Sequence, residues 1–140
     1  MSRRKYHDHL RAVPLFSQVD KHDLDVIDSA ITTLSFPAGE VLMREGSTAR
    51  EMVIVVDGEL SVSRDGEEIA TIGPGGFAGE MGLLTDHRRS ATVSAKTDVH
   101  ILHIDARAFD SVLQEAPQVA VAMLPIVASR VLENNEHHTH

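Results

Sequence analysis

A turn rich in glycine, an acid and a pair of arginines follow one another closely in the stretch 73–93, which reads GPGGFAGEMGLLTDHRRSATV. Glycine has no Cβ, so its backbone can come close to an anion and can adopt a positive φ. The run 81–84 is about one helical turn long, and the N–H groups at the start of such a turn favour a bound anion. Arg89 can donate a planar pair of charged hydrogen bonds to phosphate oxygens. These residue types therefore predict capture of a phosphate.

Glu80 predicts a second kind of contact. An ionised carboxylate only accepts hydrogen bonds, so it repels a phosphate and suits a hydroxyl donor such as a ribose 2′-OH. An acid and an arginine on either side of one helical turn fit a ligand that carries both a sugar hydroxyl and a phosphate. The same spacing also fits a structural ion pair between Glu80 and Arg89. The stretch has neither the Gly-Lys-Ser/Thr of a Walker loop nor the G-x-G-x-x-G of a dinucleotide site.

The stretch resembles the phosphate-binding cassette of cyclic nucleotide-binding domains, the family of bacterial catabolite-activator proteins, kinase regulatory subunits and nucleotide-gated channels. The family pattern is roughly F-x-G-E-φ-G/A-L-φ, a short variable loop and then R-S/T/A-A-T-V. Residues 77–84 match the first half and residues 89–93 the second, although many members lack the residue that Ala78 inserts after the aromatic. The resemblance implies that Glu80 binds the ribose 2′-OH and Arg89 the cyclic phosphate. It implies a ligand site formed by Phe77, Gly79, Glu80, Met81, Gly82, Leu83, Arg89, Ser90 and Ala91.

The rest of the chain must position this cassette, and most of it is predicted to form short strands. About eight strands at spacings of about 8–12 residues indicate a sandwich or barrel with antiparallel pairing. The dipeptides Asp57-Gly58 and Asp65-Gly66 are strong signals of tight turns. The run Met52–Val56 is apolar throughout, which is typical of a buried strand. The predicted strands cover residues 32–36, 41–44, 52–56, 60–64, 69–72, 90–95 and 99–104.

Helices are expected on both sides of the strands. Asp20 is suited to cap a helix over 20–30, and Asp105 one over 106–113. A longer helix is predicted over 118–132, where Pro125 should kink it or delay its start. In the family that the chain resembles, the two C-terminal helices act as hinge and lid. The predicted fold class is therefore α+β: an antiparallel jelly-roll-like β-barrel flanked by N-terminal helices and C-terminal hinge and lid helices.

A length of 140 residues indicates one domain, and the resemblance places it at residues 10–132. Residues 1–9 and 133–140 are predicted to be disordered ends, because they are polar and charged. His100 and His103 could suggest a metal site, but residues three apart on a strand point to opposite faces. We therefore expect no metal site in this chain.

Composition excludes several classes of function. The chain has no Cys, so it has neither a disulfide framework nor a Cys-ligated metal. A net charge of −8 argues against nucleic-acid binding, which depends on Lys and Arg. No apolar run approaches about 18 residues, so no membrane span is expected. The first ten residues do not resemble a signal peptide, and we expect a cytoplasmic location.

Enzymatic activity is not predicted, because no Ser lies in a G-x-S-x-G elbow and no paired acids or metal ligands gather. With the resemblance, we interpret the chain as a cyclic nucleotide-binding regulatory module that needs no cofactor. Its partner would be a protein effector, either attached or separate. Ser90 follows the cassette arginine where Thr is often associated with cyclic GMP, so cyclic AMP (cAMP) is favoured over cyclic GMP (cGMP). The alternative is a ligand-independent protein-interaction module of the same fold.

Overall fold

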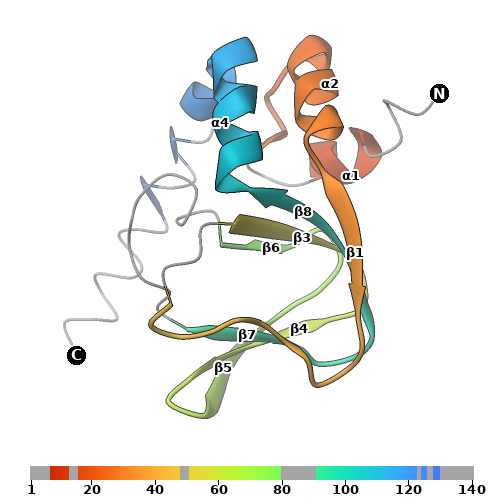
Figure 1. The fold of residues 1–140 in the computed structure, drawn as a ribbon, viewed down its shortest axis with the longest axis vertical. Helices are drawn as coiled ribbons and strands as arrows, with labels where there is room; N and C mark the ends of the chain where they lie inside the picture. Colours follow the sequence, from red (N-terminus) through yellow and green to blue (C-terminus); the bar gives the residue numbers. More distant parts are fainter. Residues whose placement is uncertain are drawn as a thin grey trace. The chain divides into compact units, whose positions relative to one another are not determined.

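The computed structural model divides into two compact units (Figure 1). One unit is formed by Met1–Ser29 and Asp110–His140, and the other by Ala30–Phe109. The division falls inside a helix, α4 (Ala106–Glu115). The structure describes residues 7–12, 16–47, 51–79, 91–122, 124–125 and 128–129.

The unit Ala30–Phe109 is built of antiparallel strands, as predicted. Its described residues form two four-stranded sheets, with strand orders β1-β8-β3-β6 and β2-β7-β4-β5. Every pairing in both sheets is antiparallel. The strands are β1 (Thr32–Phe36), β2 (Val41–Met43), β3 (Glu51–Asp57), β4 (Leu60–Arg64), β5 (Glu67–Ile72), β6 (Phe77–Ala78), β7 (Thr92–Ala95) and β8 (Val99–Asp105).

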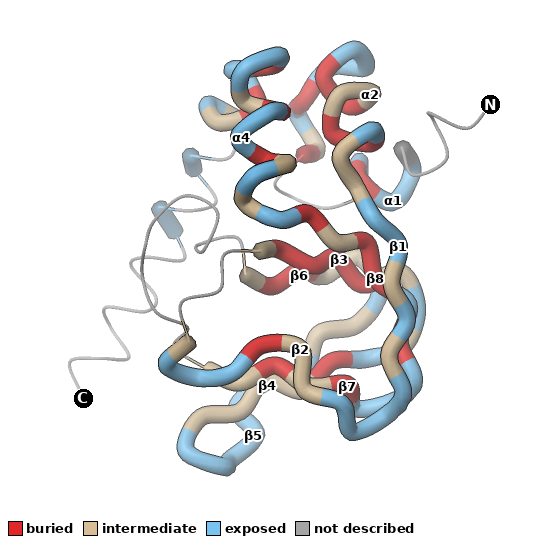
Figure 2. Tube along the Cα trace, viewed as in Figure 1, coloured by how far each residue is buried: buried red, intermediate tan, exposed pale blue. Residues whose placement is uncertain are grey.

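The core of this unit lies where alternate residues of the two sheets meet. From the first sheet, Val53, Val55 and Ile101 belong to one buried cluster, and Leu60 and Val93 join it from the second. Figure 2 shows buried residues along β3, β6 and β8 of the first sheet and shorter buried segments in the second sheet. The intervening residues of β3 and β8 are buried as well, which explains why both strands read as nearly continuous apolar runs. They are Met52, Ile54, Leu102 and Ile104.

The two predicted turns perform different tasks. Asp65 and Gly66 have φ of 53° and 82°, as a type I′ hairpin turn requires, and they join the paired strands β4 and β5. Asp57-Gly58 instead carries the chain from the first sheet to the second, because β3 and β4 do not share a sheet. Gly58 has φ of 86°, and a Cβ there would lie 2.2 Å from the carbonyl oxygen of Asp98. Only glycine fits that position without rearrangement.

Several strand boundaries differ from the prediction. β5 begins at Glu67 instead of Ile69, because the type I′ turn starts pairing immediately after Gly66. β7 begins at Thr92, and Ala91 precedes it. β6 was not predicted as a strand, since two residues are too few to show an alternating pattern.

The helical unit has buried apolar residues at helical spacing. It contains α1 (His7–Ala12) and α2 (Lys21–Ser29), where Leu24 and Ile27 are buried. Asp20 caps α2 as predicted, since its Oδ1 accepts a hydrogen bond of 2.9 Å from the Asp23 amide. α1 overlaps the end of the predicted disordered segment.

The segment after α4 is helical at residues 118–122, 124–125 and 128–129. The predicted effect of Pro125 depends also on neighbours that lie outside the described residues. Within the described part of the chain, no helix has the length and apolar character needed to cross a membrane.

Candidate functional site

The cassette identified in the sequence connects the two sheets of the β-unit. At its start, β6 is an edge strand of the first sheet, where Phe77 pairs with Ile54 and Ala78 with Val53. At its end, β7 pairs with both β2 and β4 in the second sheet. The two described ends of the cassette are therefore fixed to different sheets of one unit.

The glycine-rich turn before the cassette binds to the sheet. The Gly76 amide donates to the Gly73 carbonyl oxygen at 2.9 Å, and Gly75 has φ of 86°, which defines a type II turn with Pro74 at its second position. The Gly75 amide donates to the carbonyl oxygen of Val55 at 2.8 Å, and the Val55 amide donates back to Gly76 at 2.9 Å. The amides of Gly75 and Gly76 are thus already used within the chain. The glycines of this turn allow its backbone to approach β3 closely.

The start of the cassette is fixed by burial of Phe77. Its side chain is 5% exposed, and its neighbour Ala78 belongs to the core cluster between the sheets. Because adjacent strand residues point to opposite faces, Phe77 faces away from the space between the sheets. Gly79 has φ of 90°, which favours glycine and turns the chain out of β6.

The other end of the cassette is held by Thr92. Its Oγ1 accepts a hydrogen bond of 3.1 Å from the Glu45 amide, which ties the start of β7 to the residues that follow β2. Ala91, just before it, is half-buried. Both ends of the cassette are thus held in place by the β-unit.

The remaining predicted ligand residues lie outside the part of the chain that the structure describes. Both interpretations of Glu80 and Arg89, as ligand contacts or as an ion pair with each other, therefore stay predictions. The residues concerned are Glu80, Met81, Gly82, Leu83, Arg89 and Ser90.

The two histidines of β8 point to opposite faces, as predicted. His100 is exposed, and its Nδ1 lies 2.9 Å from Oγ of Ser35 on β1. His103 is half-buried, and its Nε2 is hydrogen-bonded to Oε2 of Glu51 on β3. Sequence reasoning considered His103 only as a metal ligand and missed this pair, because 52 residues separate its members. Among the described residues, no group of three or more His, Cys, Asp or Glu side chains could hold a metal ion.

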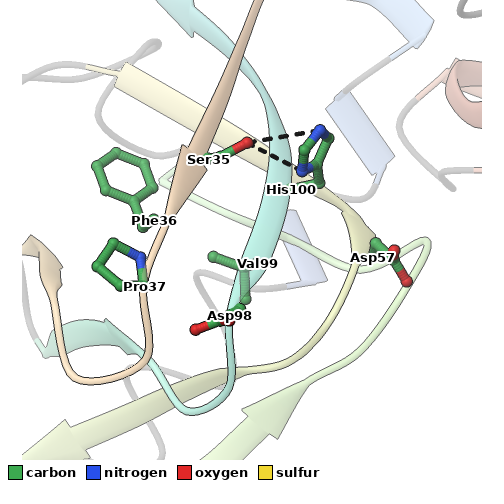
Figure 3. Close-up of a pocket in the computed structure, with 7 residues that line it drawn as sticks. All are labelled: Ser35, Phe36, Pro37, Asp57, Asp98, Val99 and His100. Carbon is green, nitrogen blue, oxygen red and sulfur yellow. Dashed lines mark hydrogen bonds between the residues drawn. The ribbon is translucent and has the colours of Figure 1, made fainter.

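A shallow depression of about 400 Å³ lies beside His100 (Figure 3). The pair Ser35 and His100 lies near Asp57 there, a set of residue types that hydrolases use. All three residues are exposed, and Asp57 directs its carboxylate away from the imidazole in Figure 3. The set therefore lacks the buried, oriented acid that would activate a serine. The depression is lined by Ser35, Phe36, Pro37, Asp57, Asp98, Val99 and His100.

Two antiparallel sheets joined by a cassette of this pattern define a class of nucleotide-sensing module. The chain belongs to the cyclic nucleotide-binding domain family, whose pattern matches residues 33–116. It is a cyclic nucleotide-binding regulatory domain.

Known relatives support this assignment. A cyclic nucleotide-gated potassium channel of Mesorhizobium japonicum is 38% identical over 109 residues, which are 78% of this chain and 30% of the channel. The cAMP-dependent protein kinase regulatory subunit of Schizosaccharomyces pombe is 31% identical over 115 residues, which are 81% of this chain and 28% of that subunit. The chain thus spans less than a third of these curated relatives.

Solved structures share the fold. The N-terminal domain of a transcriptional regulator from Streptomyces coelicolor superposes with a TM-score of 0.80 at 27% identity, over 94% of this chain and 95% of that domain. The regulatory domain of Toxoplasma gondii PKA, crystallised with cAMP, has a TM-score of 0.72 at 30% identity. That match covers 81% of this chain and 45% of the Toxoplasma chain.

Proposed function

We propose that this domain binds cAMP in preference to cGMP and regulates an effector by moving its C-terminal helices. The observation that carries the proposal is a two-part cassette whose ends are fixed to two different sheets. Ser90 at the position after Arg89 favours cAMP, and the Toxoplasma relative with cAMP supports the same choice.

Each contact has a proposed chemical role. Arg89 donates to the cyclic phosphate, and Glu80 accepts from the ribose 2′-OH. Backbone groups of Gly79, Gly82 and Leu83 make further contacts with the nucleotide. Because the chain carries a net charge of −8, long-range attraction does not favour an anionic ligand, and affinity must come from donors held locally.

The proposed switch is a shift between two positions of the C-terminal helices. α4 would act as the hinge, since the division between the two compact units falls within it, after Phe109. The helical residues beyond Pro117 would act as the lid over the bound base. The effector is proposed to be a protein, attached or separate, in the cytoplasm.

Calorimetric titration of the chain with cAMP and cGMP tests the proposal. One charged hydrogen bond contributes about 1.5–3 kcal/mol, so Arg89→Ala should weaken cAMP binding by about 10- to 150-fold. Arg88→Ala is the matched control, because it removes an equal charge from the adjacent position and should change affinity little. Equal losses from the two substitutions would contradict the role of Arg89. Tighter binding of cGMP would contradict the proposed selectivity.

The alternative function, protein interaction without ligand regulation, predicts a different result. A ligand that binds the native state must raise the unfolding midpoint. A midpoint that stays constant at saturating cAMP and cGMP would therefore favour the alternative.

A further inference from the structure

Strand β5 forms one edge of the second sheet. It lies at the end of the strand order, and among the described residues it pairs only with β4. The first five of its six residues are exposed, and Ile72 is half-buried. Ile69, Thr71 and Ile72 have β-branched side chains, which favour extended structure. An exposed edge of this kind can pair with a strand of another chain.

The bonding of β4 to its neighbours shows which backbone groups of β5 point outward. The Lys96 amide, directly after β7, donates to the Glu59 carbonyl oxygen at 2.9 Å, so Glu59 directs its backbone groups toward β7. Successive strand residues alternate in this respect, so Leu60 directs its groups toward β5, where its partner is Ile72. Ile72 therefore directs its groups toward β4. Thr71, one residue earlier, directs its N–H and C=O away from β4.

One residue interrupts the pairing of β5 with β4. Ser63 pairs with Glu68, and Val62 pairs with Ala70. Ile69, between Glu68 and Ala70, has no partner of its own in β4. The edge strand therefore contains a β-bulge at Glu68–Ile69.

The bulge changes the spacing of the outward backbone groups. Ser63, like Glu59, directs its groups toward β7, so its partner Glu68 directs its own groups away from β4. The outward residues Glu68 and Thr71 thus lie three positions apart. A regular strand directs groups to one side at every second residue. A regular partner strand therefore cannot bond to both Glu68 and Thr71.

Charge gives this edge little protection of its own. Oε2 of Glu68 lies 3.4 Å from Nζ of Lys96, and Oε1 accepts a hydrogen bond of 2.7 Å from the Ser61 hydroxyl. The lysine offsets the negative charge of Glu68, which reduces the repulsion between this edge and another acidic chain. The bulge is therefore the stronger obstacle to pairing.

We propose that the Glu68–Ile69 bulge prevents β5 from pairing with β5 of a second copy of the chain. In such a pair, two identical edges would meet antiparallel about a two-fold axis. Both outward residues would have to bond to the other copy, and the extra residue between them prevents this. The proposal does not depend on the proposed nucleotide site.

Deletion of Ile69 tests the proposal, because it restores the regular alternation and retains every pair between β4 and β5. Sedimentation equilibrium should show that the deletion variant self-associates at least about tenfold more tightly than the unsubstituted chain. Tenfold corresponds to about 1.4 kcal/mol, close to the net contribution of one backbone hydrogen bond. The deletion also removes an exposed apolar side chain, which by itself would weaken association.

Two control variants locate the effect. Ile69→Ala removes the same apolar side chain but keeps the bulge, so this variant should associate no more tightly than the unsubstituted chain. Thr71→Pro, added to the deletion, removes an outward amide that β4 does not use. This second change should return the association to that of the unsubstituted chain.

A folded deletion variant whose association is unchanged would overturn the proposal. So would tight association that persists after Thr71→Pro is added. Glu67→Thr combined with Glu68→Thr removes both acids and keeps the bulge, and it decides the question should circular dichroism show that the deletion variant is unfolded. Unchanged association of this double variant would support the bulge as the obstacle. Tighter association would assign the protection to charge and overturn the proposal.

Discussion

Substitution of Gly58 should destabilise the β-unit more than substitution of any open glycine turn. Alanine at a positive φ costs about 1–2 kcal/mol in backbone strain. At Gly58 the new Cβ would also lie 2.2 Å from the Asp98 carbonyl oxygen and 2.9 Å from Cγ1 of Val99. The nearest of these is a backbone atom of the residue just before β8, so relief requires two segments of the chain to move apart. Overpacking of this kind costs about 1–3 kcal/mol more. The total expected loss for Gly58→Ala is about 2–5 kcal/mol.

Gly66→Ala separates the strain from the clash. Gly66 has φ of 82°, close to the 86° of Gly58, but a Cβ there would meet nothing within 4 Å. The backbone strain is therefore shared by both variants, and only Gly58→Ala adds the clash. We expect Gly66→Ala to cost about 1–2 kcal/mol.

Urea denaturation followed by far-ultraviolet circular dichroism measures both changes, and the method suits a chain without Trp. The difference between the variants reports the contact with Asp98. A difference below about 0.5 kcal/mol, within the usual scatter of such measurements, would refute the reasoning, since the contact would then impose no cost of its own.

Two further predictions concern side chains that hold local structure. Asp105→Ala should lower the unfolding free energy by about 0.5–2 kcal/mol, because Oδ1 of Asp105 accepts the Ala108 amide at 2.8 Å at the start of α4. Asp105→Asn, which keeps an acceptor, should retain most of the stability in the same denaturation assay, and an equal loss would exclude the capping role. The Ser61 hydroxyl donates to Glu68 at 2.7 Å and, with help from Lys96, lowers the pKa of that carboxyl. A lowered pKa stabilises the native state above the unfolded-state pKa, and this contribution is lost as the pH falls through the folded-state pKa. Ser61→Ala should therefore raise the pKa of Glu68 toward its ordinary value, as measured by NMR titration of the carboxyl carbon, and an unchanged pKa would assign the shift to Lys96 instead.

Features with a local cause were predicted well from the sequence. The strands predicted over 32–36 and 60–64 coincide with β1 and β4 to the residue. The capping roles of Asp20 and Asp105 were also correct, because a cap is a contact between residues three apart. The Asp65-Gly66 hairpin followed from the two positive φ angles that its turn type requires.

Features that depend on a distant partner were not predictable. The role of the glycine-rich turn before the cassette depends on Val55, which lies about twenty residues earlier and is bonded to it only after the sheet forms. The Glu51–His103 pair depends on the register between β3 and β8. Neither register nor sheet order follows from the alternation of apolar residues within a strand. The cassette itself was recognised because its two halves are contiguous motifs, each readable without knowledge of the fold.

The residues that fix the ends of the cassette differ from the residues proposed to bind the ligand. The described ends of the cassette are fixed by backbone bonds and buried side chains: β6 to β3, and Thr92 to the Glu45 amide. The residues proposed to bind the nucleotide lie between those ends. Changes to the frame, such as Gly58→Ala, should therefore appear first in the unfolding free energy. Changes to Arg89 should appear in affinity. Measuring stability and affinity on one set of variants would thus test whether the frame and the ligand contacts are energetically separate.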